Sequence, residues 1–372
     1  MEYMVTSGAQ VGTGEGQGAV ARLYGTTLAR RSLLFAGLCI LLVVLGIWAV
    51  SVGSYQLSLS EVIRSLMGLE TGTGRIVVWS IRLPRITAAV VAGCGLGLSG
   101  VVTQSLLKNP LASPFTLGIN QGAACGAAFA IVALGAGGLD QGALAASGPL
   151  AWSIPGVCAV TLCAFTGAMT ATVVILVLAR LRGMSPESVI LAGIALSALF
   201  TSGTILIQYF ASEVELAAVV FWTFGDVARS GWQELGILGA VTLAVLVYFL
   251  MNRWNLNALA AGEDEAQALG VNVTGLRLSG MILATLVAAL VTAFHGVIAF
   301  LGLLAPHIGR RLVGGDHRLL LPFSCLIGAL LLLGADTAGR LLVGSGALPV
   351  GVLTSFMGAP LFLFLLIRGI HR

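Results

Sequence analysis

Charged residues are scarce in this sequence. Asp, Glu, Lys and Arg make up 9% of the 372 residues, and Lys108 is the sole lysine. A soluble globular domain carries about 25% charged residues, so this chain lacks what an ordinary water-facing surface needs. Hydrophobic residues reach 58%, and the mean hydropathy is +1.01. The composition predicts a protein that uses lipid as its main solvent, with no nucleic acid as partner.

Motifs for catalysis and metal binding are also missing. A P-loop needs GxxxxGK[ST], but Lys108 is followed by Asn109 and has no glycine before it. No HExxH, no nucleophile elbow and no pair of carboxylates in one span occur, and no two of the six cysteines have CxxC spacing. We therefore expect no catalytic residue, no metal site and no cofactor, and we interpret the cysteines as small buried hydrophobic residues. Any active transport would need energy from a partner.

Long apolar runs dominate what is present. A helix that crosses ~30 Å of hydrocarbon needs ~20 mostly apolar residues. The sequence therefore predicts an all-α integral membrane protein with about ten transmembrane helices, near residues 33–52, 85–107, 115–137, 155–179, 188–210, 234–251, 278–297, 298–313, 319–343 and 349–368. The stretch 278–313 could be one bent helix, but it is too long for one crossing and contains possible breaks at Gly296, Gly302 and Pro306.

The chain ends and the glycines add two expectations. Residues 1–28 are glycine-rich, polar and without periodicity, which predicts a disordered cytoplasmic tail before a permease domain over 29–372. Arg30 and Arg31 precede an apolar run that is too long for a signal peptide, so this run is interpreted as an anchor. Among the 50 glycines, Gly118, Gly122 and Gly126 share one helix face, which indicates close packing against a neighbouring helix.

The distribution of positive charge predicts the orientation. With ten spans, alternate loops place thirteen Lys and Arg residues on one side and six on the other, the six being Arg64, Arg75, Arg82, Arg85, Arg229 and Arg340. Because cytoplasmic loops carry the excess of positive charge, both termini are expected in the cytoplasm. The membrane is expected to be the inner, or cytoplasmic, membrane of the cell.

Ionisable residues inside the spans are few. Asp336 is interpreted first as a buried partner of Arg340, one helical turn away. His295 could be a proton relay, but a histidine hydrogen-bonded at a helix break is the simpler interpretation. Since ion-coupled transporters keep ionisable groups near the bilayer midplane, this scarcity argues against ion coupling.

The loop 257–276 after the sixth span contains a candidate partner-binding helix. Glu263, Asp264 and Glu265 suit its first turn, because carboxylates favour the positive end of the helix dipole. Ala266 and Leu269 would give it an apolar edge, and Gly270 is a natural C-cap. The pattern alone fits a solvated loop equally well.

Many short motifs together resemble the FecCD family of permeases, which includes importer permeases for vitamin B12, iron-siderophores and haem. The resemblance covers roughly residues 55–370 and is carried by Ile81–Arg85, Gly93–Gly100 with Gln104, Asn109–Ala112, Leu191–Gly193, Gly262–Val271, Gly302-Leu303 with Pro306-His307, Asp316–Arg318, Leu320–Pro322, Ala335-Asp336, Leu348–Gly351 and Gly358–Pro360. Each motif alone is weak, whereas all of them in order are specific.

The resemblance implies a transmembrane permease subunit of a type II ABC importer. Such a permease forms a dimer, with itself or with a close paralogue, above two cytoplasmic ABC ATPases, and an extracytoplasmic binding protein delivers the metal chelate. The loop matching 257–276 would contact the ATPase, and the fifth and tenth spans would line the pathway. Imported cargo would be an iron chelate, haem or a cobalamin-type complex, moved by alternating access.

The resemblance also assigns roles to residues at both ends of the spans. Arg82, Arg85 and Arg340 match positions that pair with glutamates of the binding protein, although headgroup binding and the Asp336–Arg340 pair stay open as alternatives. The segment Asn109, Pro110 and Leu111 resembles the family's cytoplasmic gate, and Ser185 with Pro186 is interpreted as its counterpart. The alternatives for the whole chain are an ion-coupled secondary transporter of a small solute and a passive channel.

Overall fold

The protein is a bundle of helices in a computed structural model that describes residues 13–53, 55, 58–69, 72–136, 156–181, 185–343 and 348–370. Every regular element in these ranges is a helix, and seven of the helices are long and apolar enough to cross a membrane. The elements are α1 (Thr13–Ser51), α2 (Leu59–Leu66), α3 (Thr73–Ile76), η1 (Val77–Arg82), α4 (Leu83–Leu106), η2 (Phe115–Leu117), α5 (Ile119–Val132), α6 (Gly156–Leu181), α7 (Pro186–Tyr209), α8 (Glu213–Thr223), η3 (Val227–Arg229), α9 (Trp232–Met251), α10 (Arg253–Ala261), α11 (Glu263–Ala268), α12 (Val273–His295), α13 (Leu301–Val313), α14 (His317–Val343) and α15 (Val350–Ile370).

Each of the ten predicted spans coincides with a separate helix. Two of them, α5 and α13, have 14 and 13 residues, so at 1.5 Å per residue they reach only about 21 and 20 Å. Each follows non-α backbone, η2 before α5 and residues 296–300 before α13. Such backbone is tolerated at membrane depth where protein surrounds it, and Gly296, Ile298 and Ala299 are buried. The stretch 278–313 is therefore two helices.

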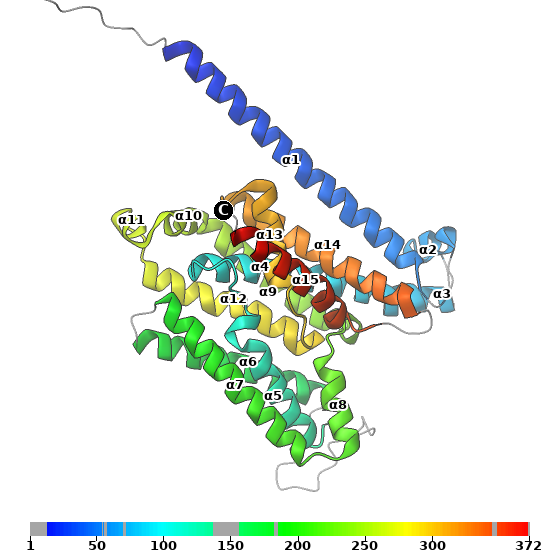
Figure 1. Ribbon diagram of the computed structural model, residues 1–372. Helices are drawn as coiled ribbons and strands as arrows, with labels where there is room; N and C mark the ends of the chain where they lie inside the picture. Colours follow the sequence, from blue (N-terminus) through cyan, green and yellow to red (C-terminus); the bar gives the residue numbers. More distant parts are fainter. Residues whose placement is uncertain are drawn as a thin grey trace, which may run out of the picture.

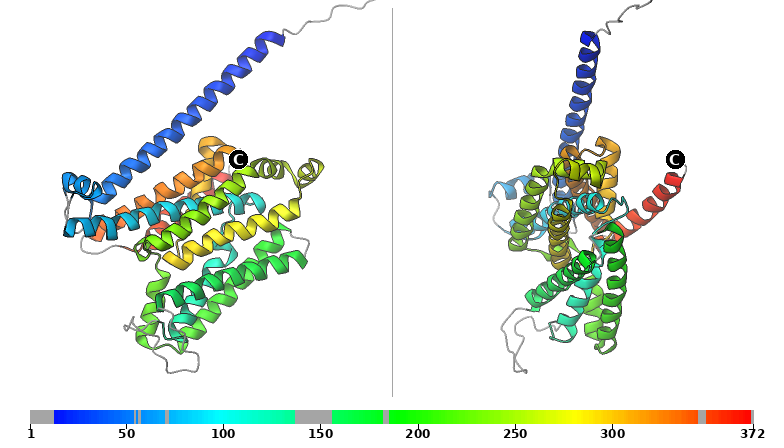
Figure 2. Two further views of the ribbon diagram at one scale, coloured as in Figure 1. Left: turned by 180° about the vertical axis from the view of Figure 1, so that it is seen from behind. Right: turned by 90° about the vertical axis from the view of Figure 1, so that its left-hand side faces the viewer.

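The helix α1 begins earlier than the sequence predicts. Its 39 residues correspond to about 58 Å, and Figure 2 shows its N-terminal part projecting beyond the bundle. The predicted disordered tail, 1–28, thus contains helix from Thr13 onward, while residues 1–12 lie outside the described residues. Extending an existing helix adds one hydrogen bond per residue without a new nucleus, which explains how the anchor continues into a segment with a weak pattern of its own.

The second span also begins earlier than predicted, as one continuous helical run from Thr73 to Leu106. The sequence predicts its start near residue 85, from the apolar run alone. Instead a π-helical turn, η1, leads into Pro84, and the Leu83 N–H donates to the Val78 carbonyl. A wider turn accommodates a residue that lacks an N–H and crowds the preceding carbonyl.

Close backbone packing holds the centre of the bundle, where α4 contacts α9, α12, α13 and α14. A Cβ added at Gly93 would lie 2.4 Å from the Gly328 carbonyl oxygen, and one at Gly97 2.2 Å from that of Ser324, so α4 and α14 approach as only glycine permits. The predicted glycine face of α5 behaves in the same way, since a Cβ at Gly126 would lie 2.0 Å from the Cys163 oxygen of α6. Gly118 instead caps α5 with a φ of +77°.

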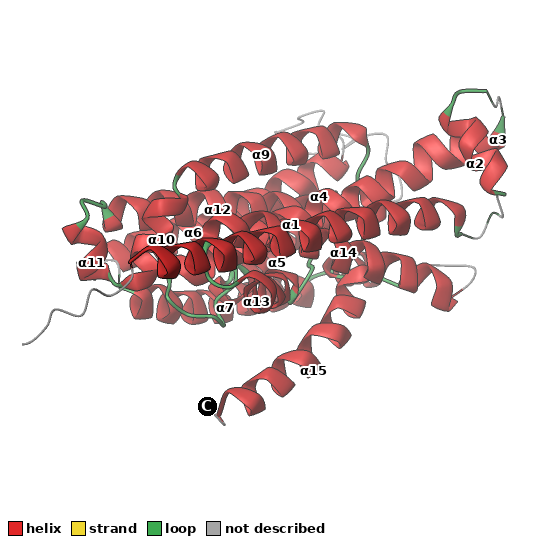
Figure 3. Cartoon of the chain, turned by 90° about the horizontal axis from the view of Figure 1, so that it is seen from above, coloured by secondary structure: helices red, strands yellow, loops and turns green. Residues whose placement is uncertain are grey.

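The two ends of the bundle differ. Figure 1 shows α10 and α11 at one end, together with the N-terminal end of α1 and the C-terminus, and it shows α2, α3 and α8 at the other. We call these the α11 end and the α2 end. Seen from above, α15 diverges from the other helices toward the C-terminus (Figure 3). The N-terminal end of α1 and the C-terminal end of α15 thus lie at the end that carries the candidate partner-binding loop.

Candidate functional site

The predicted short helix at the α11 end is present and is preceded by a second one. The helices α10 and α11 meet at Gly262, and the acidic residues Glu263, Asp264 and Glu265 occupy the first turn of α11. A Cβ on Gly262 would collide with the Glu265 side chain, at 1.5 Å from Oε2. The apolar edge is divided, because Ala266 is fully buried whereas Leu269 is 74% exposed. Leu269 is the large apolar side chain that is exposed in this loop.

Gly270 ends α11 in a Schellman motif. Its φ is +82°, its N–H donates to the Gln267 carbonyl at 2.9 Å, and the Val271 N–H donates to the Ala266 carbonyl at 2.9 Å. This pair of bonds satisfies the last carbonyls of a helix and requires a left-handed residue. The predicted C-cap is therefore correct, and it fixes the direction in which the chain enters α12.

Ion pairs tie α11 to the body of the protein. Glu263 Oε1 lies 2.5 Å from Arg277 Nη2 and 3.8 Å from Lys108 Nζ. The Arg277 side chain is 3% exposed, and its Nε donates to the Leu106 carbonyl at 3.2 Å, at the C-terminus of α4. A cation there is favoured by the negative end of the helix dipole. The α11 end of α4 thus contacts the loop through side chains.

The two candidate gate segments lie at the same end of the bundle, one directly after α4 and one directly before α7. The Asn109 Oδ1 accepts the Leu111 N–H at 2.9 Å, which closes a turn directly after α4, and Pro110 and Leu111 are exposed. Ser185 is the N-cap of α7, where its Oγ accepts the Ser188 N–H at 3.2 Å, and Pro186 is the first residue of the helix. Asn109–Leu111 is thus an irregular turn, whereas Ser185 and Pro186 form the start of α7, and their role as a gate stays a prediction.

The candidate docking arginines at the α2 end are held inside the chain. Arg85 Nη2 lies 2.8 Å from Asp336 Oδ1, and Arg340 Nε lies 3.1 Å from Asp336 Oδ2, within ion-pair distance but without the alignment of a hydrogen bond. Asp336 is fully buried, and the side chains of Arg85 and Arg340 are 14% and 9% exposed. The predicted Asp336–Arg340 pair is confirmed, and Arg85 is a second partner that the sequence did not suggest.

Arg82 caps the end of α1. Its Nη1 donates to the Val50 carbonyl at 2.5 Å and to the Ser51 carbonyl at 3.3 Å, its Nη2 donates to the Tyr55 carbonyl, and the residue is 5% exposed. Arg340 likewise donates from Nη1 to the Ala49 carbonyl at 3.0 Å. These contacts satisfy carbonyls that a helix C-terminus leaves without intrahelical partners. In the structure, Arg82 and Arg340 stabilise the connection after α1, and a docking role for them stays a prediction.

His295 lies at the break between α12 and α13. The residue is fully buried, its Nδ1 lies 3.2 Å from the Val291 carbonyl and its Nε2 lies 3.2 Å from Ser230 Oγ. The helix-break interpretation is therefore correct in its geometry. Beside it, the Asp226 N–H donates to the His295 carbonyl at 2.8 Å, so this short loop also holds the chain that follows α8.

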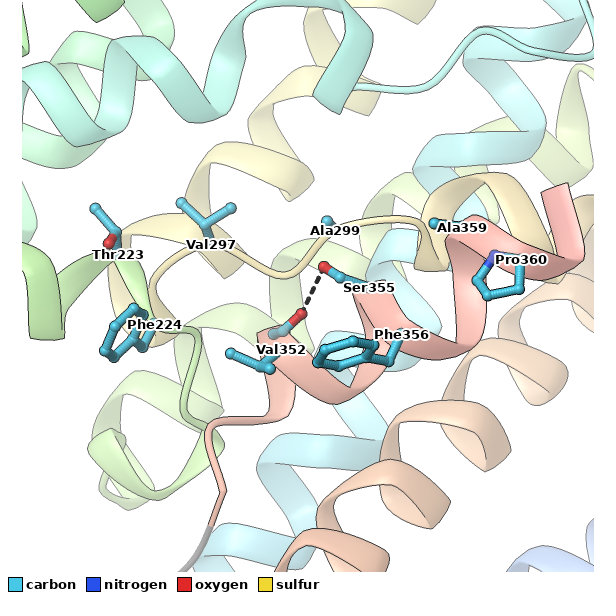
Figure 4. A pocket seen from close by; sticks show the side chains of 10 residues that line it. Thr223, Phe224, Val297, Ala299, Val352, Ser355, Phe356, Ala359 and Pro360 are labelled. Atoms are coloured by element: carbon cyan, nitrogen blue, oxygen red, sulfur yellow. Dashed lines mark hydrogen bonds between the residues drawn. The ribbon is translucent and has the colours of Figure 1, made fainter. Parts of the chain in front are cut away.

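An open apolar cavity of about 450 Å³ adjoins this break. Figure 4 shows Phe224, Val297, Phe356 and Pro360 around it, with Ser355 Oγ donating to the Gly351 carbonyl at 2.8 Å. The cavity lies between the end of α8, residues 297–299 and α15, and no ionisable or metal-ligating side chain is among the residues that line it. It suits a cargo with an apolar surface.

Comparison with known proteins gives one family. The FecCD transport family matches residues 41–368. The chain belongs to this family. An ABC transporter permease of Methanocaldococcus jannaschii is 49% identical to it, over 90% of this chain and 94% of the relative. The hemin transport system permease protein of Yersinia pestis is 35% identical, over 90% and 96%.

A solved structure supports the fold of this FecCD protein. An inward-facing conformation of a metal-chelate type ABC transporter has a TM-score of 0.75 and 31% identity, and it covers 91% of this chain and 99% of that one. The chain is thus a multi-pass membrane permease of the ABC importer type, as the motifs in Sequence analysis indicated. Membership in this family sets aside the ion-coupled transporter and the passive channel.

Several residues of this FecCD permease have contacts that the sequence did not predict. Asp226 lies 3.7 Å from Arg85, and α8 itself was not expected. At the α11 end, His317 lies 2.7 Å from Asn257 and 2.6 Å from Ser105. The partners in each contact are at least 60 residues apart in the chain, so no local spacing could have connected them.

Proposed function

We propose that this permease imports a metal chelate, which is an iron-siderophore, haem or a cobalamin-type complex, by ATP-driven alternating access. A cytoplasmic ABC ATPase dimer supplies the energy, and an extracytoplasmic binding protein delivers the cargo. The α11 end then faces the cytoplasm, with both termini, in agreement with the excess of positive charge assigned to that side.

The loop 257–276 carries the coupling to the ATPase. Its two short helices lie at the α11 end (Figure 1), and Leu269 is 74% exposed there beside Asp264 and Glu265. An exposed leucine on an otherwise acidic helix gives a soluble partner one apolar anchor with a charged rim, which is how protein interfaces are built. The buried Ala266 and the Glu263–Arg277 pair hold this anchor on the body of the permease.

The cavity beside α15 is the first place where cargo would contact the chain. Its lining is apolar, with Phe224 and Phe356 as the aromatic residues. A chelate whose metal is already wrapped by its ligand needs no metal-binding side chain, and aromatic faces suit a planar or ring-rich cargo. A second copy of the permease, or a close paralogue, would complete the pathway along α7 and α15.

The outer arginines would dock the binding protein by exchange of partners. Arg85 and Arg340 share the carboxylate of Asp336, so a glutamate from outside would compete with that carboxylate for them. Charge pairs of this kind set orientation and association rate more than affinity. Arg82 would contribute through the position of the α1–α2 connection that it holds. The gate at Asn109–Leu111, with Ser185 and Pro186, would open at the opposite end.

The cargo can be identified from the ATPase rate of the reconstituted complex. The permease, its ATPase and its binding protein are placed in liposomes, and the binding protein is loaded in turn with haem, with an iron-siderophore or with cobalamin. We expect one class of chelate to raise the ATPase rate and to enter the vesicles. If none of the three did either, the proposed cargo would be wrong.

A further inference from the structure

The α11 end of α4 is a junction of side chains from four other elements. Gln104 Oε1 accepts a hydrogen bond from Arg310 of α13, Ser105 meets His317 of α14, the Leu106 carbonyl accepts from Arg277 of α12, and Lys108 lies near Glu263 of α11. The next residue is Asn109, the first of the candidate gate. No other part of a span that the structure describes has the gate directly after it and the coupling loop directly against it.

One set of contacts runs from α10 through His317, and we call it the His317 arm. Asn257 Oδ1 accepts the His317 backbone N–H at 2.9 Å and lies 2.7 Å from its Nδ1, while His317 Nε2 lies 2.6 Å from Ser105 Oγ. Asn257 Nδ2 also donates to Asp316 Oδ1 at 2.9 Å. His317 is 2% exposed and Ser105 is half-buried, so the arm connects α10 to α4 within the protein.

A second set of contacts runs from α11 through Arg277, and we call it the Arg277 arm. Glu263 Oε1 lies 2.5 Å from Arg277 Nη2, and Arg277 Nε donates to the Leu106 carbonyl at 3.2 Å. Charge-assisted hydrogen bonds of this type are about twice as strong as neutral ones. The two arms start on different helices of the coupling loop and end on adjacent residues of α4.

From this geometry we infer that His317 and Arg277 are positioning residues that join the coupling loop to the gate. Through the two arms, α10, α11 and the last turn of α4 move as one unit, so a displacement of the loop by the ATPase reaches Asn109 directly. This inference rests on the proposed function of the loop and of the gate. It adds a connection through side chains to the covalent one, which runs back along the chain through α9, α8, α7, α6 and α5.

Two features favour transmission through the arms. The covalent route from Glu263 to Asn109 passes along the full lengths of helices, whereas each arm spans a single side chain between the loop and α4. Coupling between sites is carried by contacts that are packed and have discrete arrangements. The buried His317 and Arg277 fit this requirement, because each has its hydrogen-bonding atoms directed at two different elements.

The arms can be cut with mild substitutions. Ser105→Ala removes the oxygen at the α4 end of the His317 arm, and Glu263→Gln removes the charge at the start of the Arg277 arm. Thr292→Val is the matched control, because it removes a buried hydrogen bond of 3.0 Å between α12 and Asn120 that belongs to neither arm. Thermal unfolding in detergent then tests whether each variant is folded.

The first measurement is the distance between spin labels on the loop and on the gate. Labels at Leu269→Cys and Leu111→Cys, both at exposed positions, are used after the six native cysteines have been replaced by alanine. We expect a narrow distance distribution in the parent and in Thr292→Val, and a clearly wider one in the Ser105→Ala/Glu263→Gln double variant. An unchanged distribution in a folded double variant would overturn the inference, even without any partner present.

The second measurement is the amount of cargo transported per ATP hydrolysed in the complete reconstituted complex. The double variant should lose transport per ATP by about 2- to 30-fold, the range that corresponds to measured changes in coupling between sites. Equal transport per ATP in the double variant and the parent would contradict the inference while leaving the importer intact. A parent complex without ATP-dependent uptake would instead refute the proposed function.

Discussion

Arg85 and Asp336 are 251 positions apart in the chain, yet Arg85 Nη2 lies 2.8 Å and its Nε 2.9 Å from the same carboxylate oxygen. The contact joins the beginning of α4 to the α2 end of α14. Arg340 approaches the other oxygen of Asp336 from one helical turn away. A single buried carboxylate therefore lies between two guanidinium groups at the α2 end of the bundle.

Removal of that carboxylate should destabilise the permease. In Asp336→Asn both arginines keep their charge but lose the buried carboxylate between them, and breaking a buried pair from one side costs about 3–5 kcal/mol. Asp226→Asn is the matched control, because Asp226 is 37% exposed and 3.7 Å from Arg85, and an exposed pair contributes at most about 1 kcal/mol. The measurement is the free energy of unfolding of each variant in detergent. If Asp336→Asn were as stable as the parent, the cluster would not support the fold.

Glycine packing between α5 and α6 gives a second prediction. Gly126→Ala places a Cβ against the Cys163 carbonyl oxygen, and overpacking of this kind costs about 1–3 kcal/mol. Gly236→Ala in α9 meets nothing within 4 Å and should stabilise the helix by up to about 1 kcal/mol. Thermal unfolding should lower the midpoint of the first variant and maintain or raise that of the second. Similar midpoints for both would show that α5 and α6 are not in such close contact.

Leu269→Asp should separate ATP hydrolysis from transport. The side chain is 74% exposed, so the substitution leaves folding within about 0.5 kcal/mol of the parent while it removes the apolar anchor for the ATPase. Leu69→Asp is the control, since Leu69 is 73% exposed and follows α2 at the opposite end. We expect the first variant to copurify with less ATPase and to transport less per ATP. If Leu269→Asp copurified with a normal amount of ATPase and transported normally per ATP, the loop 257–276 would be an ordinary solvated loop.

Docking of the binding protein should depend on Arg85 more than on Arg75. Arg85→Gln removes the charge that an external carboxylate would capture, so docking should weaken and its salt dependence should decrease. Arg75→Gln is the control, because Arg75 is exposed on α3 and makes no ion pair in the part of the chain that the structure describes. Dissociation constants at low and high salt test this. Equal salt slopes for parent and Arg85→Gln would leave Arg85 with a structural role alone.

The sequence predicts most of the fold because each span has its own local signal. Apolar runs of about twenty residues locate the crossings, and Gly296 lies where the chain divides into α12 and α13. The other two predicted break points, Gly302 and Pro306, lie inside α13 instead. The Glu263–Glu265 turn and the Gly270 cap were likewise visible, since capping depends on residues within one or two helical turns. The second span begins earlier than its apolar run indicates, because α3 and η1 continue the helix on the N-terminal side of Pro84.

The contacts around the site could not be predicted in the same way. These contacts join residues that are far apart in the chain. The separation is 251 positions for Arg85 and Asp336, 171 for Arg277 and Leu106, and 212 for His317 and Ser105. Tertiary packing, not spacing, decides such pairs. The positive-inside count treated Arg277 as one charge among thirteen, and the FecCD resemblance gave His317 only as part of a motif, so neither signal suggested what these side chains touch.

Uptake into proteoliposomes tests most directly whether this permease depends on a separate ATPase. The permease is reconstituted with and without its ATPase and loaded binding protein, and ionophores abolish every proton and sodium gradient. We predict accumulation of the chelate that requires ATP and both partners and that persists without ion gradients. Accumulation by the permease alone, driven by a proton or sodium gradient, would contradict the claim that this permease depends on a separate ATPase.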